Sequence, residues 1–249
     1  MKRIPKSHPR YFSLITREQI SKAMKHGIVH ETGLIAHGRG EAFDYLLGET
    51  TIPPADIAEK VAALSLLCAK NPVISINGNV AALAADIYVS LAKSIPAKIE
   101  INLFHRTPMR MKKIATLLRK KGAKTIYGLN PNAKIPGLDS DRALCEKEGI
   151  FTADVVLVPL EDGDRCQALR RMGKTVIAID LNPLSRTAKT ASITIVDNVT
   201  RAIPRIEYWI YELKNTKQSD LDILIKTWDN KKNLAEILSF LSKRLNSLS

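Results

Sequence analysis

The stretch Pro72-Val-Ile-Ser-Ile-Asn-Gly-Asn-Val80 decides the fold class, because an apolar, β-branched run turns through Asn77-Gly78-Asn79 into a helical segment. Similar runs follow along the chain, and the six candidate strands are residues 73–76, 98–103, 124–127, 154–158, 175–179 and 193–196. Segments with helical spacing separate the first five, at residues 80–92, 108–121, 139–148 and 164–172. Such alternation is typical of βαβ units. We therefore predict an α/β fold, Rossmann-like and doubly wound, with a mainly parallel sheet of about six strands.

The parts of the chain outside this pattern are expected to be mostly helical. The sixth strand is reached without a full helix and is expected to be antiparallel or at an edge. An extended arm (residues 1–16) is expected to precede a helix that Thr16 caps and that ends at Gly27. Other helices are expected at residues 56–70, 199–213, 219–226 and from 230 or 231 to 245. We divide the chain into a helical lead-in (1–71), the α/β core (72–215) and C-terminal helices (216–249), all in one compact unit.

The composition bounds the class of protein. With 249 residues, 45% of them hydrophobic and 25% charged, the chain has the composition of an ordinary globular protein. Its three cysteines show no CxxC spacing, which favours a reducing compartment and argues against disulfides and structural zinc. No apolar run has the length needed to cross a bilayer. We expect a cytoplasmic protein that does not bind membranes or hold a metal of its own.

The net charge of +13 calls for anionic partners. Nucleic acid is one class of partner, because phosphate neutralisation dominates that binding. Phosphorylated small-molecule substrates are another class, because several cations must then face several anions. Aromatic residues make up only 5% of the chain, which leaves little capacity for base stacking. Charge alone does not decide between the two classes.

A second informative segment runs from Gly33 to Gly48. Its first half places His37 and Arg39 beside the glycines of His-Gly-Arg-Gly, and its second half is expected to be a short helix beginning at Glu41. A loop of donors leading into a helix N-terminus is suited to binding phosphate. The alternative is a glycine-rich turn whose histidine and arginine are surface residues.

Ligands of doubly wound folds bind at the carboxyl ends of the strands, which locates further candidates. The backbone of Asn77, Gly78 and Asn79 is a candidate contact for a substrate phosphate, although a tight βα turn is the alternative. Arg106 is a candidate for a phosphate or carboxylate, because its guanidinium suits both. Neither a G-x-G-x-x-G fingerprint nor a P-loop motif is present.

The segment Asp180-Leu-Asn-Pro-Leu-Ser-Arg-Thr187 follows the fifth candidate strand. Asp180 could accept hydrogen bonds from a ribose, and Arg186 could bind phosphates. In the alternative, Asp180 caps a turn and pairs with Arg186.

Several of these motifs, in this order, closely resemble archaeal phosphopantothenate synthetase, also called 4-phosphopantoate–β-alanine ligase. The resemblance is carried by Ile4-Pro-Lys-Ser-His-Pro-Arg-Tyr11, by Arg17-Glu18, by the run from Gly33 to Gly48 and by the segment from Asp180 to Thr187. It implies a dimeric enzyme of coenzyme A biosynthesis that joins 4-phosphopantoate to β-alanine through an acyl adenylate, with ATP converted to AMP and pyrophosphate. Mg²⁺ is expected to bridge the phosphates, because it binds mainly through substrate oxygens.

The resemblance also implies which residues bind the nucleotide. The positions that match the family's ATP site are Arg17, Arg39, Asp180, Leu181, Asn182, Arg186, Thr187, Asn198 and Val199. Arg39, Arg186 and His37 are the candidate catalytic residues, because they could cancel negative charge in the transition state. The residue that accepts the amine proton stays open among Glu41, Asp44 and Asp197.

Two other classes of function are weighed against the ligase. One is an NAD(P)-dependent Rossmann-type oxidoreductase, and the missing glycine fingerprint argues against it. The other is the basic nucleic-acid-binding module considered above. A C-terminal apolar stripe could dock on its own domain or form the interface of a homodimer, and the dimeric family favours the second use. Its residues are Leu234, Ile237, Leu238 and Leu241.

Overall fold

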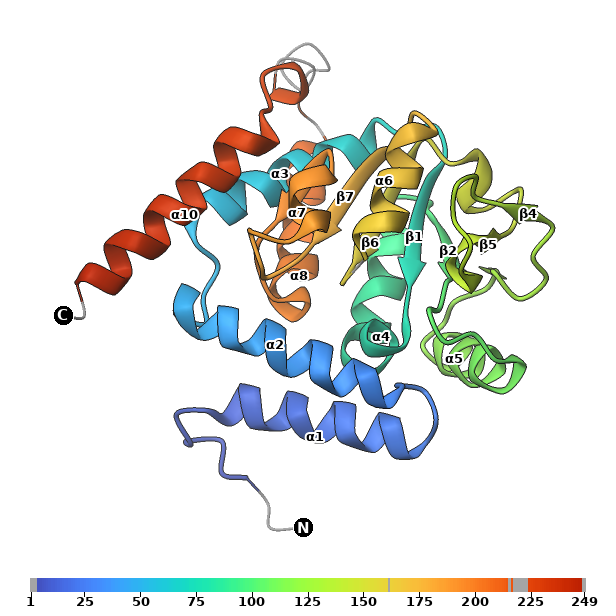
Figure 1. Ribbon diagram of the computed structural model, residues 1–249, viewed down its shortest axis with the longest axis horizontal. Helices are drawn as coiled ribbons and strands as arrows, with labels where there is room; N and C mark the ends of the chain where they lie inside the picture. Colours follow the sequence, from blue (N-terminus) through green and yellow to red (C-terminus); the bar gives the residue numbers. More distant parts are fainter. Residues whose placement is uncertain (1–3, 161, 215, 217–223, 248–249) are drawn as a thin grey trace.

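Six parallel strands form the centre of the computed structural model, which describes residues 4–160, 162–214, 216 and 224–247 (Figure 1). The strands are β1 (Pro72–Ile76), β2 (Lys98–Ile101), β3 (Ile126–Tyr127), β6 (Val155–Pro159), β7 (Thr175–Ile179) and β8 (Ile193–Ile195). They lie in the order β3-β2-β1-β6-β7-β8, and every neighbouring pair is parallel. The order reverses between β1 and β6, as in Rossmann folds. The predicted fold class is confirmed.

Helices cover both faces of this sheet. One face packs against α3 (Pro53–Leu67), α4 (Gly78–Ser94), α5 (Pro108–Lys120) and α8 (Val199–Leu213). The other face packs against α6 (Gly163–Arg171), with the short α7 (Arg186–Thr190) beside it. Successive residues of a strand point to opposite faces of the sheet. Val73 packs on the face covered by α6, and Ile74 packs on the face covered by α3, α4, α5 and α8. Both faces are apolar, which explains why the strands are continuous hydrophobic runs.

All six strands lie where the sequence pattern predicts them, and so do the helices α3, α4, α5, α6, α8 and α10 (Asn230–Asn246). β8 is parallel to β7 and lies at the edge of the sheet, so the edge position is confirmed and the antiparallel alternative is wrong. The helix α8 begins at Val199 and ends at Leu213 as expected, although it contains Pro204.

The helix expected at residues 139–148 does not form. The segment contains a 3₁₀ turn (Asp141–Ala143) and the strand β5 (Leu144–Cys145), which pairs with β4 (Ala133–Lys134), and a second 3₁₀ turn follows at Ile150–Thr152. The reason is a buried carboxylate on β2, because Glu100 accepts the backbone N–H groups of Glu146 (3.0 Å) and Ile150 (2.6 Å). These long-range bonds satisfy the backbone better than a helix could.

Two helices, α1 (Tyr11–Lys25) and α2 (Glu31–Leu47), lie against each other across one end of the sheet (Figure 1). Helix α1 begins five residues before the predicted cap, so the extended arm is shorter than expected. Thr16 is inside the helix, where its hydroxyl donates to the carbonyls of Phe12 (3.1 Å) and Ser13 (2.8 Å).

The His-Gly-Arg-Gly segment is the middle of helix α2, so the predicted loop of donors is wrong. Helix α2 is capped by His30 at its N-terminus and by Gly48 at its C-terminus, and Gly48 has a left-handed φ of 91°. Glycine lowers helix propensity by only about 1 kcal/mol, and packing against neighbouring elements can offset that. Gly33 allows such packing, because a Cβ there would lie 2.4 Å from the Asn79 side chain.

The C-terminal helix α10 (Asn230–Asn246) packs on its own chain, against α2, α3, α7 and β8. Leu234, Ile237 and Leu241 are buried there, and Leu238 is 37% exposed. Most of the stripe expected at a dimer interface is therefore used inside the chain, which argues against that interface assignment. The predicted helix at 219–226 begins outside the described residues.

The division into a lead-in, an α/β core and C-terminal helices stays a prediction. Helix α3 belongs to the predicted lead-in, but it packs in the main core beside the sheet. Among the described helices, none is both long and apolar enough to cross a bilayer.

Candidate active site

A cavity of about 490 Å³ lies at the carboxyl ends of β6, β7 and β8. Leu160, Leu181 and Asp197, which follow these three strands, line one side of it. Helices α1 and α2 close the opposite side and contribute Ser13 and His37. The cavity is therefore at the end of the sheet where ligands of this fold bind.

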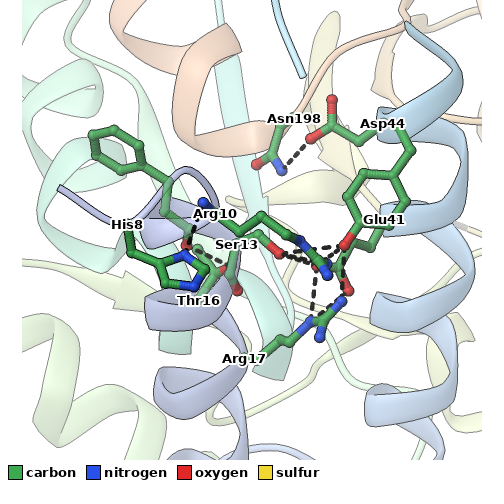
Figure 2. A network of polar contacts seen from close by, with 10 residues as sticks. His8, Arg10, Ser13, Thr16, Arg17, Glu41, Asp44 and Asn198 are labelled. Atoms are coloured by element: carbon green, nitrogen blue, oxygen red, sulfur yellow. Dashed lines mark hydrogen bonds and ion pairs between the residues drawn. The ribbon is translucent and has the colours of Figure 1, made fainter. Parts of the chain in front are cut away.

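On the helical side, Glu41 organises a polar network that joins α1 to α2 (Figure 2). Arg17 donates through Nε to both carboxylate oxygens of Glu41, at 2.9 Å each, and through Nη2 to Tyr45 at 2.8 Å. The hydroxyl of Ser13 also donates to Glu41. Burial raises the pKa of Glu41, but the hydrogen bonds from Arg17 and Ser13 outweigh it and leave the pKa below its usual value. Glu41 is therefore an anion held in place by its donors.

Arg10 lies at the same wall of the cavity. Figure 2 shows its guanidinium beside Glu41, at a distance of 4.0 Å, and it also lies over the Tyr45 ring. Its side chain is 43% exposed, so it has room to turn toward an anion in the cavity. Sequence reasoning did not select Arg10, although it belongs to the N-terminal motif that carries the family resemblance.

On the sheet side, Arg201 bridges two buried carboxylates. Its Nη2 atom lies 2.5 Å from Asp44 on α2 and 2.5 Å from Asp197 at the end of β8. Asn198 adds a hydrogen bond to Asp44 (3.2 Å), and its side-chain oxygen caps α8 by accepting the N–H of Thr200 (3.1 Å). This cluster fixes α2 against the N-terminus of α8. Sequence reasoning missed Arg201, although it lies four residues after Asp197 in the first turn of a predicted helix.

The three residues considered as acceptors of a proton, Glu41, Asp44 and Asp197, all line the cavity. Each of them is already paired with an arginine. For Glu41 this pairing holds the pKa below its usual value. The structure therefore brings the three together but gives each of them an arginine partner.

His37 also lines the cavity, from the middle of α2. Its Nε2 atom is buried and has no hydrogen-bond partner among the described residues. Burial lowers the pKa of His37 below its usual value, so the ring is neutral near pH 7. A neutral imidazole cannot cancel negative charge, which argues against that role for His37, but it can accept a proton.

The segment after β7 forms a turn organised by Asp180. The carboxylate accepts the N–H of Asn182 (3.0 Å) and the hydroxyl of Ser185 (2.5 Å), and burial raises its pKa. Arg186 forms an ion pair with Asp164 on α6 and is exposed. The capping alternative for Asp180 is therefore right, whereas its predicted pairing with Arg186 is wrong.

The cavity takes in only part of the expected nucleotide site. Leu181, Asn198 and Val199 line it, and Arg17 borders it through Glu41. Arg39 is exposed on α2, and its charge acts on Asp180. The remaining expected nucleotide residues belong to the turn after β7 and do not line the cavity, and they are Asp180, Asn182, Arg186 and Thr187.

The turn Asn77-Gly78-Asn79 serves packing in this structure. Asn77 caps α4 by accepting the N–H of Val80 (3.0 Å) and donates to the carbonyl of Pro159 (2.9 Å). Asn79 donates to the carbonyl of Gly33 (2.8 Å). A Cβ at Gly78 would lie 2.5 Å from the carbonyl oxygen of Ile28. The alternative of a tight βα turn is therefore favoured over the predicted phosphate contact.

Arg106 lies elsewhere, in a second cavity of about 330 Å³ beside α5. Its Nη2 atom donates to the carbonyl of Gly128 (2.5 Å), and its Nη1 atom is buried without a partner among the described residues. This cavity shares no lining residue with the first. The structure thus separates Arg106 from the other candidates.

Comparison with known proteins gives one consistent family. A family model described as phosphopantothenate/pantothenate synthetase matches residues 54–244. A protein of Thermococcus onnurineus named 4-phosphopantoate–β-alanine ligase is 53% identical over 250 residues, which cover 100% of this chain and 96% of the relative. Proteins of the same name from Methanosarcina mazei and Methanospirillum hungatei are 53% and 57% identical. Those matches cover 99% and 84% of this chain, and 97% and 86% of the relatives.

Proposed function

The chain belongs to the phosphopantothenate/pantothenate synthetase family, and we propose that it is the ATP-dependent ligase that joins 4-phosphopantoate to β-alanine. The product is 4′-phosphopantothenate, an intermediate of coenzyme A biosynthesis. One observation carries the proposal. The chain is 53% identical in sequence to two relatives that bear this name, over 96% and 97% of their length. Such similarity extends through both sides of the cavity, from α1 to α8.

The cavity suits a nucleotide in size and position. Its volume of about 490 Å³ lies within the usual range of about 300–1,000 Å³ for small-molecule sites. The N-terminus of α8 meets the cavity at Asn198 and Val199, so the helix dipole favours an anionic group there. Arg10 and Arg17 lie at the opposite wall. We assign the phosphates of ATP to the space between these two sides.

Mg²⁺ fits this site as an ion carried by the nucleotide. Among the described residues, no group of three or more His, Cys, Asp or Glu side chains is arranged to hold a metal. Asp44 and Asp197 are engaged by Arg201, whereas Glu49 at the cavity forms no ion pair with a described residue. Glu49 is therefore the protein group available to Mg²⁺, which otherwise binds phosphate oxygens and water.

The reaction assigned to this site has two steps. The carboxylate of 4-phosphopantoate attacks the α-phosphorus of ATP, and pyrophosphate leaves. The amine of β-alanine then attacks the acyl carbon of the adenylate, AMP leaves, and the amine gives up a proton. The arginines of the cavity stabilise the charge that develops on the phosphates, and the closed helical side limits access of water to the adenylate.

His37 is the residue we assign to accept the amine proton. It is neutral at pH 7, lines the cavity and has an unpartnered ring nitrogen. Because protonation of His37 would abolish this role, we expect activity to fall on the acid side, below pH 6.5. Loss of a general base typically costs about a hundred- to ten-thousand-fold in rate.

We also propose a cytoplasmic homodimer. Cys145 and Cys166 are buried thiols, as expected in a reducing compartment. The dimer rests on the family resemblance and on large apolar side chains that remain exposed, among them Phe12 (83%), Ile35 (71%) and Tyr211 (75%). A homodimer would bury some of these side chains.

The proposed activity is tested by AMP release in the presence of ATP, Mg²⁺, 4-phosphopantoate and β-alanine, with each omitted in turn. We expect AMP release at the full rate only when all four components are present. The amount of 4′-phosphopantothenate formed should equal the amount of AMP. Conversion of His37→Gln should lower kcat strongly, whereas His26→Gln, at an exposed position outside the cavity, should retain wild-type kcat. ATP turnover that does not depend on either acid substrate would contradict the assignment.

A further inference from the structure

Glu59 is an unexplained carboxyl beneath the active-site cavity. It belongs to α3, which packs against α8 and β8, and its side chain is completely buried. Neither of its oxygens accepts a hydrogen bond from a described residue. A buried carboxylate without any donor is strongly unfavourable, so the group must be neutral. A neutral carboxyl has a hydroxyl that needs an acceptor.

The candidate acceptor is Asp197, which follows β8, the strand that packs against α3, and whose negative charge acts on Glu59. Oδ1 of Asp197 already accepts from the N–H of Asn198 (2.7 Å) and from Arg201, whereas Oδ2 accepts from Thr51 (2.5 Å). A carboxylate oxygen can accept two hydrogen bonds, so Oδ2 has room for a second donor. Glu59 and Asp197 thus share one proton.

The charges around Glu59 favour its neutral form. Burial raises its pKa to about 9, and the negative charges of Asp197 at the end of β8 and Asp56 on α3 act in the same direction. Arg205 on α8 opposes them, but it is engaged by Asp56 at 2.6 Å. Arg201 is shared between two aspartates and leaves no cation for Glu59.

We propose that Glu59 is a positioning residue of the ligase: its protonated carboxyl donates to Asp197 and thereby holds Asn198 and Arg201 in place at the cavity. Glu59 is not among the residues expected to bind substrate, and it does not line the cavity. It acts through Asp197, which contacts both cavity residues directly. The catalytic consequence rests on the proposed function, whereas the shared proton does not.

Deprotonation of Glu59 would place two carboxylates in contact away from water. Their repulsion would displace Asp197, and Asn198 would lose the acceptor of its backbone N–H at the start of α8. Since this helix start faces the cavity, we expect weaker binding of ATP at high pH. The effect should appear in KM for ATP more than in kcat.

Two substitutions of Glu59 distinguish the hydrogen bond that it donates to Asp197 from its ability to ionise. Glu59→Gln keeps a donor toward Asp197 and cannot ionise, whereas Glu59→Leu removes the donor. Glu236→Gln makes the same chemical change at an exposed position on α10 and serves as the control. Glu100, whose pKa burial raises to about 7, also titrates in this range in every variant, so only the difference between wild type and Glu59→Gln reports on Glu59.

The experiment measures kcat/KM for ATP from pH 6 to pH 10 in the wild type and the three variants. We expect a fall approaching tenfold per pH unit above pH 9 in the wild type and in Glu236→Gln, and a distinctly shallower profile in Glu59→Gln. Glu59→Leu should raise KM for ATP at least about tenfold at pH 7, and Glu59→Gln should restore most of that loss. The same alkaline fall in Glu59→Gln as in the wild type would overturn the positioning role.

Infrared difference spectroscopy of the ligand-free protein tests the proton itself and needs no activity. We expect a carboxylic-acid C=O band at pH 7 that disappears above pH 9 and is absent from Glu59→Gln. If that band is missing from the wild type, the shared proton is wrong whatever the enzyme's substrates are. If the band is present but the chain does not use ATP, the proposed function fails and the proton assignment stands.

Discussion

Replacement of Glu59 by glutamine should change how stability depends on pH. Burial and neighbouring carboxylates raise the pKa of Glu59 from 4.5 to about 9 in the folded chain. Between these values the folded state holds a proton that the unfolded state has lost, so unfolding becomes easier as pH rises. One pKa unit corresponds to roughly 1.4 kcal/mol, and the full shift therefore corresponds to roughly 6 kcal/mol.

The assay is urea denaturation at several pH values between 5 and 9, with Glu236→Gln as the control for loss of a surface charge. We expect the free energy of unfolding of Glu59→Gln to rise relative to the wild type by about 1.4 kcal/mol per pH unit through this window. Below pH 4.5 the difference should no longer change, because both states are protonated. Parallel stability curves for the wild type and Glu59→Gln would refute the reasoning.

Three other substitutions test the packing around the site. Arg201→Met leaves Asp44 and Asp197 buried without a cation, and urea denaturation should show a loss of about 3–5 kcal/mol. Gly78→Ala places a Cβ 2.5 Å from a carbonyl oxygen, so the midpoint of thermal unfolding should fall by an amount equivalent to about 1–3 kcal/mol; an unchanged midpoint would show that the backbone yields easily. Ile237→Ala in α10 should cost about 2–5 kcal/mol of stability but leave the mass measured by light scattering unchanged, whereas a lower mass would return α10 to the interface.

The sheet was predictable because its strands are buried on both faces. Each is a short run of β-branched and apolar residues, and its length separates it from the helices between strands. The order of the strands was not predicted, whereas the site at their carboxyl ends follows from the rule for ligand binding in such folds. For the same reason Asp197 and Asn198 could be placed at the cavity from the sequence alone.

The errors arose where distant contacts override local preference. The glycines of the His-Gly-Arg-Gly segment resemble a loop, but packing of Gly33 against Asn79 and the contacts of α2 keep the segment helical. Residues 139–148 have helical spacing, yet the carboxylate of Glu100 holds their backbone in another conformation. Neither partner is near in the sequence.

Parts of the candidate site could not be derived from local patterns. Arg10 reaches the cavity only because α1 folds back on α2, and Glu59 is buried only because α8 and the sheet both cover α3. The neutral state of His37 likewise depends on burial. The resemblance pointed to the nucleotide residues, and those in the turn after β7 stay predictions.

Transfer of heavy oxygen from 4-phosphopantoate to AMP is the most direct test of the central claim that this site activates a carboxylate with ATP. The substrate carries the isotope in its carboxylate, and mass spectrometry of AMP follows a reaction with β-alanine. Attack on the α-phosphorus predicts AMP that contains one labelled oxygen, because the bridging atom stays with the nucleotide when the amine opens the adenylate. Unlabelled AMP, or label in phosphate or pyrophosphate instead, would contradict the proposed reaction.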